Sequence, residues 1–289
     1  MTDGVTGEAA PEALDFEVPR VAGSGIDGLA PAPEMSRSDH FAMVREGRLG
    51  SIHSWELVTA VDGPGSRMTL FMAGCPLRCL YCHNPDTFKM KDGEPVTLDG
   101  IMERVLRYRA IFKASGGGLT ISGGEPLMQP AFVKSILREA KKNGIHTAMD
   151  TTGYLGSYVT DKDLDDLDLV LLDVKSGIPE IYKALTSREL QPTIDFGDRL
   201  AKIGKKVWVR FVLVPGHTDQ PENIDAVAEI VLRWPNIERL EVLPFHQMGR
   251  DKWDAIGTPY ELDDVIPPSN EETEAVRERF RELGVKTVY

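Results

Sequence analysis

Short apolar runs alternate with amphipathic stretches from Gly50 onward, and this alternation constrains the fold more than any other feature. It is typical of a parallel sheet with covering helices. Six runs suit an open or partial barrel, since a closed one needs eight strands. The predicted class is therefore α/β, a partial (β/α)6 TIM-like barrel. The predicted strands are Met68–Met72, Leu119–Ile121, Thr147–Met149, Leu169–Leu172, Val207–Leu213 and Leu240–Leu243. The predicted helices are Leu98–Lys113, Pro130–Lys142, Phe196–Ile203, Pro221–Trp234 and Glu271–Leu283, with caps at Thr97 and at Ser269 or Asn270.

The first 43 residues differ in composition from the rest of the 289-residue chain. Ala, Gly, Pro and acidic residues dominate, and the apolar residues Leu14, Phe16 and Val18 are isolated. Such a segment buries too little apolar surface to offset its ordering entropy. We expect residues 1–43 to form a disordered extension, for which a docking role stays open, and residues 44–289 to form one domain.

Charge and cysteine content exclude several classes of protein. The formal charge of −12 argues against a nucleic-acid groove, which needs a basic face. No apolar run approaches the roughly 18 residues of a membrane span, and the N-terminus lacks a signal-peptide pattern. We therefore expect a cytoplasmic protein. Three cysteines within eight residues suit a metal site in a reducing compartment better than a disulfide framework.

Glycine or ionisable residues follow each of the six predicted strands. The carboxyl ends of parallel strands meet at one edge, where ligands bind. The sequence therefore predicts one site assembled by the whole sheet. The strand ends in order carry Cys75, Ser122-Gly123-Gly124-Glu125, Asp150-Thr151-Thr152, Asp173-Val174-Lys175, Pro215-Gly216-His217 and Pro244-Phe245-His246.

The cysteines have the spacing C-x₃-C-x₂-C at Cys75, Cys79 and Cys82. Three thiolates so close can hold one iron–sulfur cube. The chain has no fourth cysteine, so one iron would stay open to another ligand. A zinc site of the three cysteines and His83 is the alternative.

With Tyr81 before the last cysteine, this motif resembles the signature of the radical S-adenosylmethionine superfamily. The resemblance implies a [4Fe–4S] cluster whose open iron binds S-adenosylmethionine, which is cleaved reductively to a 5′-deoxyadenosyl radical. Gly123-Gly124-Glu125 resembles the family's Gly-Gly-Glu, which contacts the methionine moiety of the cofactor. Without that context, these glycines read equally well as a strand-to-helix turn.

Asp150, Thr151, Asp173 and Lys175 form a further set at neighbouring strand ends. Alone they read as surface ion pairs. Within one crevice, clustered carboxylates call for a hard cation. Here the chain resembles the activases that act on pyruvate formate-lyase, which implies a Na⁺ or K⁺ site at Asp150, Thr151 and Asp173. Asp173-Val174-Lys175 matches that family's Asp-Leu-Lys cofactor contact, with valine in place of leucine.

The same resemblance implies roles for three more residues. His246 would lie against the adenosyl group, and Asp62 and Arg210 beside the substrate peptide. A structural histidine and a core-edge ion pair are the respective alternatives for His246 and Arg210, and His217 receives no role. The implied catalytic set is Cys75, Cys79, Cys82 and Lys175. The implied cofactor-binding set is Tyr81, Cys82, His83, Gly123, Gly124, Glu125, Asp173, Val174, Lys175 and His246.

The resemblance implies a monomeric activase that abstracts a hydrogen atom from a glycine Cα in the glycyl loop of pyruvate formate-lyase. Reduced flavodoxin or ferredoxin would supply the electron. An activase of another glycyl radical enzyme stays open as the second hypothesis. Many of those carry a cysteine-rich insert, for which the fifteen residues from Asn84 to Leu98 leave no room. A non-catalytic zinc-binding interaction module is the third hypothesis.

Overall fold

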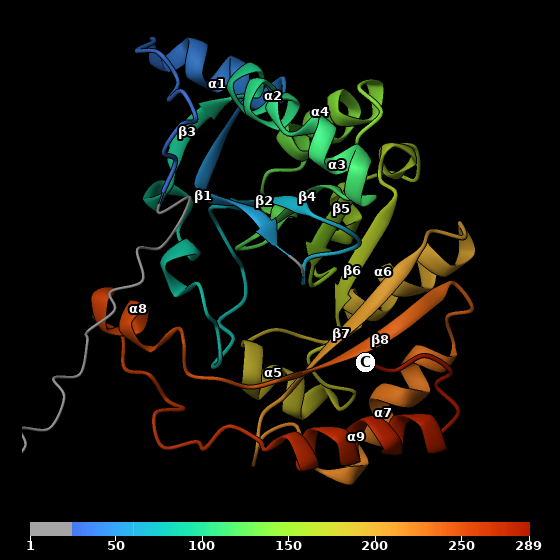
Figure 1. Ribbon diagram of the computed structural model, residues 1–289. Helices are drawn as coiled ribbons and strands as arrows, with labels where there is room; N and C mark the ends of the chain where they lie inside the picture. Colours follow the sequence, from blue (N-terminus) through green and yellow to red (C-terminus); the bar gives the residue numbers. More distant parts are fainter. Residues whose placement is uncertain (1–24, 60) are drawn as a thin grey trace, which may run out of the picture.

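One curved sheet organises residues 25–59 and 61–289, which the computed structural model describes (Figure 1). Its strands are β1 Leu49–Thr59, β2 Arg67–Met72, β3 Glu94–Thr97, β4 Gly118–Gly123, β5 His146–Thr151, β6 Leu169–Asp173, β7 Val207–Leu213 and β8 Ile237–Pro244. They lie in the order β3-β1-β2-β4-β5-β6-β7-β8. The strands from β2 to β8 in that order run parallel, whereas β1 is antiparallel to both neighbours.

All six predicted strands are present, and they form the parallel part of the sheet, so the predicted partial (β/α)6 arrangement is confirmed. The sequence did not predict β1 and β3. In β1 the buried apolar residues Leu49, Ile52 and Trp55 are three apart, and the pairing with β2 shifts register at a bulge between Ile52 and Ser54. This spacing hides the alternation that marks a strand.

Nine helices lie around the outside of the described sheet (Figure 1). The predicted Leu98–Lys113 helix is two helices, because the backbone leaves the helical conformation at Tyr108 (φ −101°, ψ 5°). The three unpredicted helices, α1, α5 and α8, each have fewer than three turns and so carry little periodic pattern. The helices are α1 Arg37–Arg45, α2 Leu98–Arg107, α3 Arg109–Ser115, α4 Pro130–Lys142, α5 Pro179–Thr186, α6 Gln191–Lys202, α7 Pro221–Leu232, α8 Arg250–Ala255 and α9 Asn270–Glu282.

Two predicted helix caps are confirmed. The Thr97 hydroxyl accepts a hydrogen bond from the Gly100 backbone N–H at 3.1 Å and so caps α2. At α9 the Ser269 hydroxyl accepts from the Glu272 backbone N–H at 3.1 Å, and the Glu272 carboxylate accepts from the Ser269 backbone N–H at 2.7 Å. This reciprocal capping box satisfies two N–H groups that the helix itself cannot pair.

Residues 25–43 of the predicted extension contact the rest of the described chain. The Trp55 indole donates a hydrogen bond to the Asp27 carbonyl at 2.9 Å, and Leu29 is buried in the main core. Residues 25–43 therefore pack on the domain, which differs from the predicted boundary because Leu29 finds an apolar partner surface. Residues 1–24 of the predicted extension lie outside the described residues.

Alternation along the central strands separates the main core from the interior of the curved sheet. On β6, Val170 and Leu172 face the core under the helices, whereas Leu169 and Leu171 lie in a separate cluster with Ala148 and Trp208. Side chains two residues apart on a strand share a face. Asp150, Asp173 and Arg210 are therefore on the interior face, each two residues nearer the carboxyl end of its strand than Ala148, Leu171 and Trp208. Between β5 and β7 the interior thus has an apolar lower layer and a charged upper layer.

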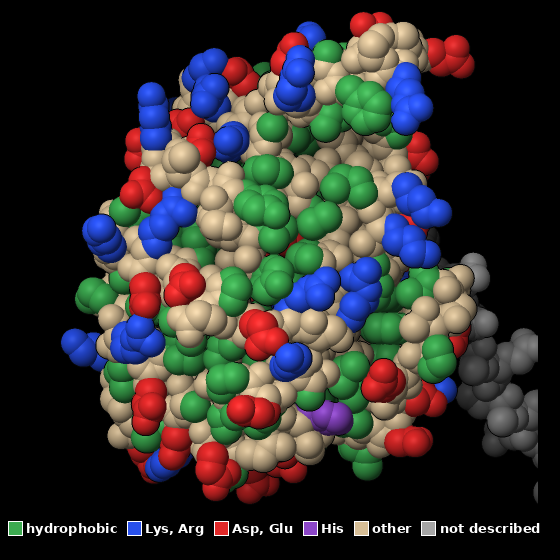
Figure 2. All heavy atoms as spheres, turned by 180° about the vertical axis from the view of Figure 1, so that it is seen from behind, with side chains coloured by type: hydrophobic (Ala, Val, Ile, Leu, Met, Phe, Trp, Pro, Cys, Tyr) green, Lys and Arg blue, Asp and Glu red, His purple; other side chains and the backbone are tan. Residues whose placement is uncertain are grey.

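The surface seen from behind mixes basic and acidic side chains with exposed apolar ones (Figure 2). Ion pairs such as Arg233–Asp198, with 2.7 Å between their charged atoms, join opposite charges locally. Among the described helices, none has the length and apolar character that crossing a bilayer would require.

Candidate functional site

A cavity of about 430 Å³ opens at the carboxyl ends of the parallel strands. It brings together residues from the ends of β2, β4, β5, β6 and β8 or the loops that follow them, and from the loop after β1. From β7 it takes Arg210 and Val212, which lie within the strand, and not the predicted Pro215-Gly216-His217. Most of the predicted site residues line it. They are Asp62, Cys75, Cys79, Tyr81, Cys82, His83, Gly123, Gly124, Asp150, Thr151, Asp173, Lys175, Arg210 and His246.

Backbone hydrogen bonds hold the cysteine loop after β2 in place. The Arg78 N–H donates to the Thr186 carbonyl at the end of α5 at 2.8 Å. The Trp253 indole on α8 donates to the Cys82 carbonyl at 2.9 Å. Two elements distant in sequence thus fix the loop, so the positions of the thiols do not depend on the loop alone.

Burial disfavours the charged form of each of the three thiols. It raises the pKa of Cys75 and of Cys79, and it raises the pKa of Cys82 to about 12. Such a thiol loses its proton when it binds a metal, because the positive charge of the metal stabilises the thiolate. The donor set therefore fits a thiolate-bound iron–sulfur cluster.

His83 lines the cavity and packs against His246. Its ring stacks on that of His246, with 3.9 Å between the centroids, and its Nε2 lies 3.1 Å from the His246 carbonyl oxygen. A zinc ion needs its ligands within about 2.3 Å of one centre. Across residues 25–59 and 61–289, no three His, Cys, Asp or Glu side chains converge on a single ion, and this holds for the three thiols as well. The described residues therefore do not match the zinc alternative, whereas an iron–sulfur cube binds each thiolate at a different iron.

Gly123 and Gly124 join the end of β4 to the end of β2. Gly123 has φ +111°, and a Cβ there would lie 2.2 Å from the Met72 nitrogen. A Cβ at Gly124 would lie 2.3 Å from the Gly74 carbonyl oxygen. Only glycine fits this close approach of two backbones. The turn leaves bare backbone against the cavity.

Glu125 and Val174, which the resemblance also places in the cofactor-binding set, are not among the residues that line the cavity. Both side chains are fully buried. The Glu125 carboxylate accepts hydrogen bonds from the hydroxyls of Thr151 and Thr152, each at 2.6 Å. These bonds tie β4 to β5, and a cofactor contact at Glu125 stays a prediction. Val174 packs in the main core, so any cofactor contact there is through its backbone.

The four charged residues of the upper layer form buried ion pairs. Lys175 Nζ lies 2.7 Å from Asp173 Oδ2, and Arg210 Nη1 lies 3.2 Å from Asp150 Oδ2. Burial alone would lower the pKa of Lys175, but the Asp173 carboxylate raises it, so Lys175 stays protonated. The Asp150 and Asp62 carboxylates likewise raise the pKa of Arg210 against the effect of burial. These are not the surface pairs of the alternative interpretation.

Three buried polar atoms around the cavity have no hydrogen-bond partner among the described residues. They are Asp150 Oδ1, Tyr81 Oη and His246 Nδ1. Buried polar groups are normally paired, because leaving one unpaired is unfavourable. A polar ligand in the cavity would supply the missing partners.

The sequence interpretation assigned no individual role to Thr152 or Glu241. Thr152 lines the cavity, and Glu241 lies behind it, within hydrogen-bonding distance of Arg210. The sequence did indicate Glu241, because an acidic residue inside the predicted strand Leu240–Leu243 would be buried and would need a cationic partner.

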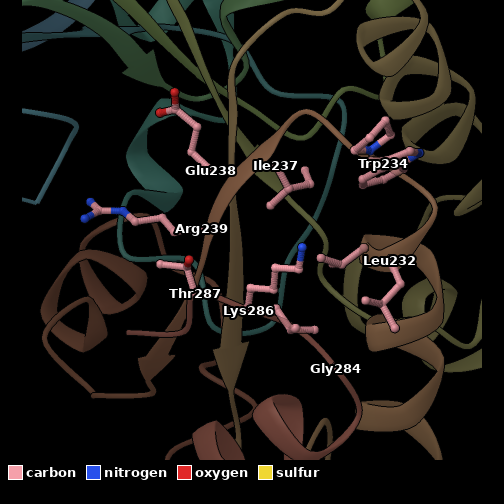
Figure 3. A pocket seen from close by; sticks show the side chains of 11 residues that line it. Leu232, Trp234, Ile237, Glu238, Arg239, Gly284, Lys286 and Thr287 are labelled. Carbon is pink, nitrogen blue, oxygen red and sulfur yellow. The ribbon is translucent and has the colours of Figure 1, made fainter.

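A second hollow of about 220 Å³ lies at the other end of β8 (Figure 3). Lys286 points into it from the chain after α9, between Arg239 on β8 and Leu232 on α7. None of the predicted site residues lines it.

Comparison with known proteins agrees with this geometry. Residues 69–227 match the family model of the Radical SAM superfamily. The chain is 42% identical over 243 residues to the pyruvate formate-lyase 1-activating enzyme of Escherichia coli strain K12, a match that covers 83% of this chain and 99% of the relative. It is also 42% identical over 236 residues to the pyruvate formate-lyase-activating enzyme of Clostridium pasteurianum, covering 81% and 98%.

Solved structures share the fold at low identity. Streptococcus suis SuiB bound to S-adenosylmethionine aligns with a TM-score of 0.55 at 16% identity, covering 74% of this chain and 47% of SuiB. A radical SAM methyltransferase from Sphaerobacter thermophilus aligns with a TM-score of 0.54 at 16% identity, covering 91% and 76%.

Proposed function

The chain belongs to the pyruvate formate-lyase-activating enzymes of the radical SAM superfamily, and we infer that it generates the glycyl radical of pyruvate formate-lyase. Enzymes of this superfamily use a [4Fe–4S] cluster and S-adenosylmethionine, and so does this chain. Together these groups supply a 5′-deoxyadenosyl radical, which takes a hydrogen atom from a glycine Cα of the partner. The protein's part is to bind, orient and shield the reactants.

Cys75, Cys79 and Cys82 are proposed as the cluster ligands. They line one cavity on an anchored loop, and the chain has no other cysteine. Three ligands leave one iron corner for the cofactor. The absence of further cysteines also leaves no thiolates for the auxiliary clusters found in other activases.

The cofactor is proposed to lie between the Gly123-Gly124 turn and the His83–His246 pair. The turn offers bare backbone to the methionine moiety, and Lys175 and Asp173 lie opposite as a charged pair. Burial lowers the pKa of His83 to about 4 and also lowers that of His246, so both rings are neutral near pH 7. A neutral stacked pair suits the flat adenine group.

A monovalent cation is proposed at Asp150, Thr151 and Asp173. In the ion-paired group, four carboxylates face three cationic side chains, which leaves one negative charge, and Asp150 Oδ1 is unpartnered. The Thr151 hydroxyl donates to Glu125 and accepts from the Gly153 N–H, so it keeps one lone pair. Hard oxygen ligands of this kind suit Na⁺ or K⁺.

The glycyl loop is proposed to enter past Asp62 and Arg210. Both line the cavity, and Val61 beside them is 69% exposed, so an extended peptide can reach this rim.

Reduced flavodoxin or ferredoxin is proposed as the electron donor. The protein is proposed to act as a monomer in the cytoplasm, because a reducing compartment keeps its thiols free.

The convergence of the three cysteines with Gly123, Gly124 and Lys175 in one cavity carries this proposal. Its test is to reconstitute the chain anaerobically with iron and sulfide, reduce it, and add S-adenosylmethionine and pyruvate formate-lyase. We expect a glycyl radical doublet by electron paramagnetic resonance. Cofactor cleavage without the doublet, but with a doublet from another glycyl radical enzyme, would favour the second hypothesis.

A further inference from the structure

Glu241 lies directly behind the proposed peptide entrance. It is on β8, opposite Arg210 in the β7–β8 register, and is 8% exposed. It does not line the cavity. Any effect it has on the reaction must therefore pass through a residue that does.

Two guanidinium groups hold the Glu241 carboxylate. Oε2 lies 3.2 Å from Arg210 Nε, and Oε1 lies 2.5 Å from Arg239 Nη2. The Arg239 guanidinium in turn lies over the Trp208 ring, 3.4 Å from its centroid. Glu241 is thus fixed from below by the apolar layer, and it fixes Arg210 above.

Arg210 connects this support to the cavity rim. Its Nη1 pairs with Asp150, and its Nη2 donates to the Val61 carbonyl and lies 3.5 Å from Asp62 Oδ1. Its three nitrogens therefore serve three different places. Because Glu241 holds Nε, the planar guanidinium directs Nη1 at Asp150 on the cavity floor and Nη2 at Val61 and Asp62, which form the cavity rim.

We propose that Glu241 is a positioning residue that holds Arg210 in the orientation in which it fixes the Val61–Asp62 rim for the incoming glycine loop. This proposal rests on the proposed function. The expected consequence is on the coupling between cofactor cleavage and glycyl radical formation. The rim must place the glycine Cα against the 5′-deoxyadenosyl radical before that radical is lost to another reaction. A loose Arg210 lets cofactor cleavage proceed without hydrogen abstraction from the partner.

The test is the ratio of glycyl radical formed to 5′-deoxyadenosine released, measured with pyruvate formate-lyase as the partner. Glu241→Gln removes the charge and keeps the shape. Because hydrogen bonds to charged groups are stronger than neutral ones, we expect the ratio to fall about tenfold. The matched control is Glu103→Gln on α2, where an exposed carboxylate pairs with Arg107 at the surface, and the ratio there should equal that of the wild type.

A double variant separates positioning from general damage. If Glu241 acts through Arg210, the double variant Arg210→Lys with Glu241→Gln should give the same ratio of glycyl radical to 5′-deoxyadenosine as Arg210→Lys alone. Additive losses, or a Glu241→Gln protein whose ratio equals that of the wild type, would overturn the proposal. A wild-type protein that forms no radical on pyruvate formate-lyase would instead refute the proposed function.

Discussion

The two ends of the same parallel strands are filled in opposite ways. On β5, β6 and β7, Ala148, Leu171 and Trp208 form an apolar lower layer, and two residues further along each strand Asp150, Asp173 and Arg210 form a charged upper layer. The lower layer closes the interior and the upper layer faces the cavity. Side chains two residues apart on a strand share a face, so a step of two residues on three strands separates the apolar supporting side chains from the charged ones at the cavity.

The largest effect is expected from Cys79→Ala, at the functional end. It removes a cluster ligand, so iron–sulfur assembly and all cofactor cleavage should be lost, while the sheet below stays folded. Iron and sulfide analysis, visible absorbance and chromatography of 5′-deoxyadenosine check this. Full activity in the variant would contradict the ligand assignment.

Trp208→Ala tests the supporting end. Removing a large buried ring should lower the free energy of unfolding by about 3–5 kcal/mol, since the Arg239 guanidinium also loses its stacking surface. Denaturant titration measures the loss. A change below about 1 kcal/mol would show that the lower layer is not a structural support.

Asp150→Asn tests the charge of the upper layer. The amide keeps the size but removes the charge that the proposed cation needs, so S-adenosylmethionine should bind about 10–100-fold more weakly and lose any dependence on Na⁺ or K⁺. Equilibrium binding in different alkali salts checks this. Asp161→Asn, whose side chain is 62% exposed, is the control. An unchanged cation response in Asp150→Asn would place the cation elsewhere.

The smallest effect concerns pH at the supporting end. Burial and then the Arg67 charge lower the pKa of His146 from 6.5. The unfolded chain therefore binds this proton more tightly, so the contribution of His146 to stability is full above pH 6.5 and is lost as the pH falls through the folded pKa. His146→Gln should flatten the fall in unfolding midpoint between about pH 8 and about pH 5. An equally steep fall in the variant would assign it to other groups.

The sequence predicted the charged end better than the rest. The parallel strands followed from the apolar runs. Most cavity residues followed from the polar groups at the ends of those runs, because parallel topology brings these ends together. The N-terminal part was harder, since the bulge in β1 breaks its alternation and residues 25–43 depend on a distant packing surface at Trp55.

Side-chain direction set the other limit. Glu125 and Val174 are in the predicted motifs, yet both point into the protein. A motif fixes the position of a residue along the chain, but the direction of its side chain depends on neighbours such as Thr151 and Thr152. Glu241 was missed for the converse reason, since its role depends on Arg210 across the sheet.

The most direct test of the account is deuterium transfer inside the cavity. Pyruvate formate-lyase made with Cα-deuterated glycine is incubated anaerobically with the reduced, reconstituted protein and S-adenosylmethionine, and the 5′-deoxyadenosine is analysed by mass spectrometry. The account predicts that deuterium enters 5′-deoxyadenosine as the glycyl radical forms. Radical formation with unlabelled 5′-deoxyadenosine would contradict the claim that the charged end of the sheet brings cofactor and glycine together.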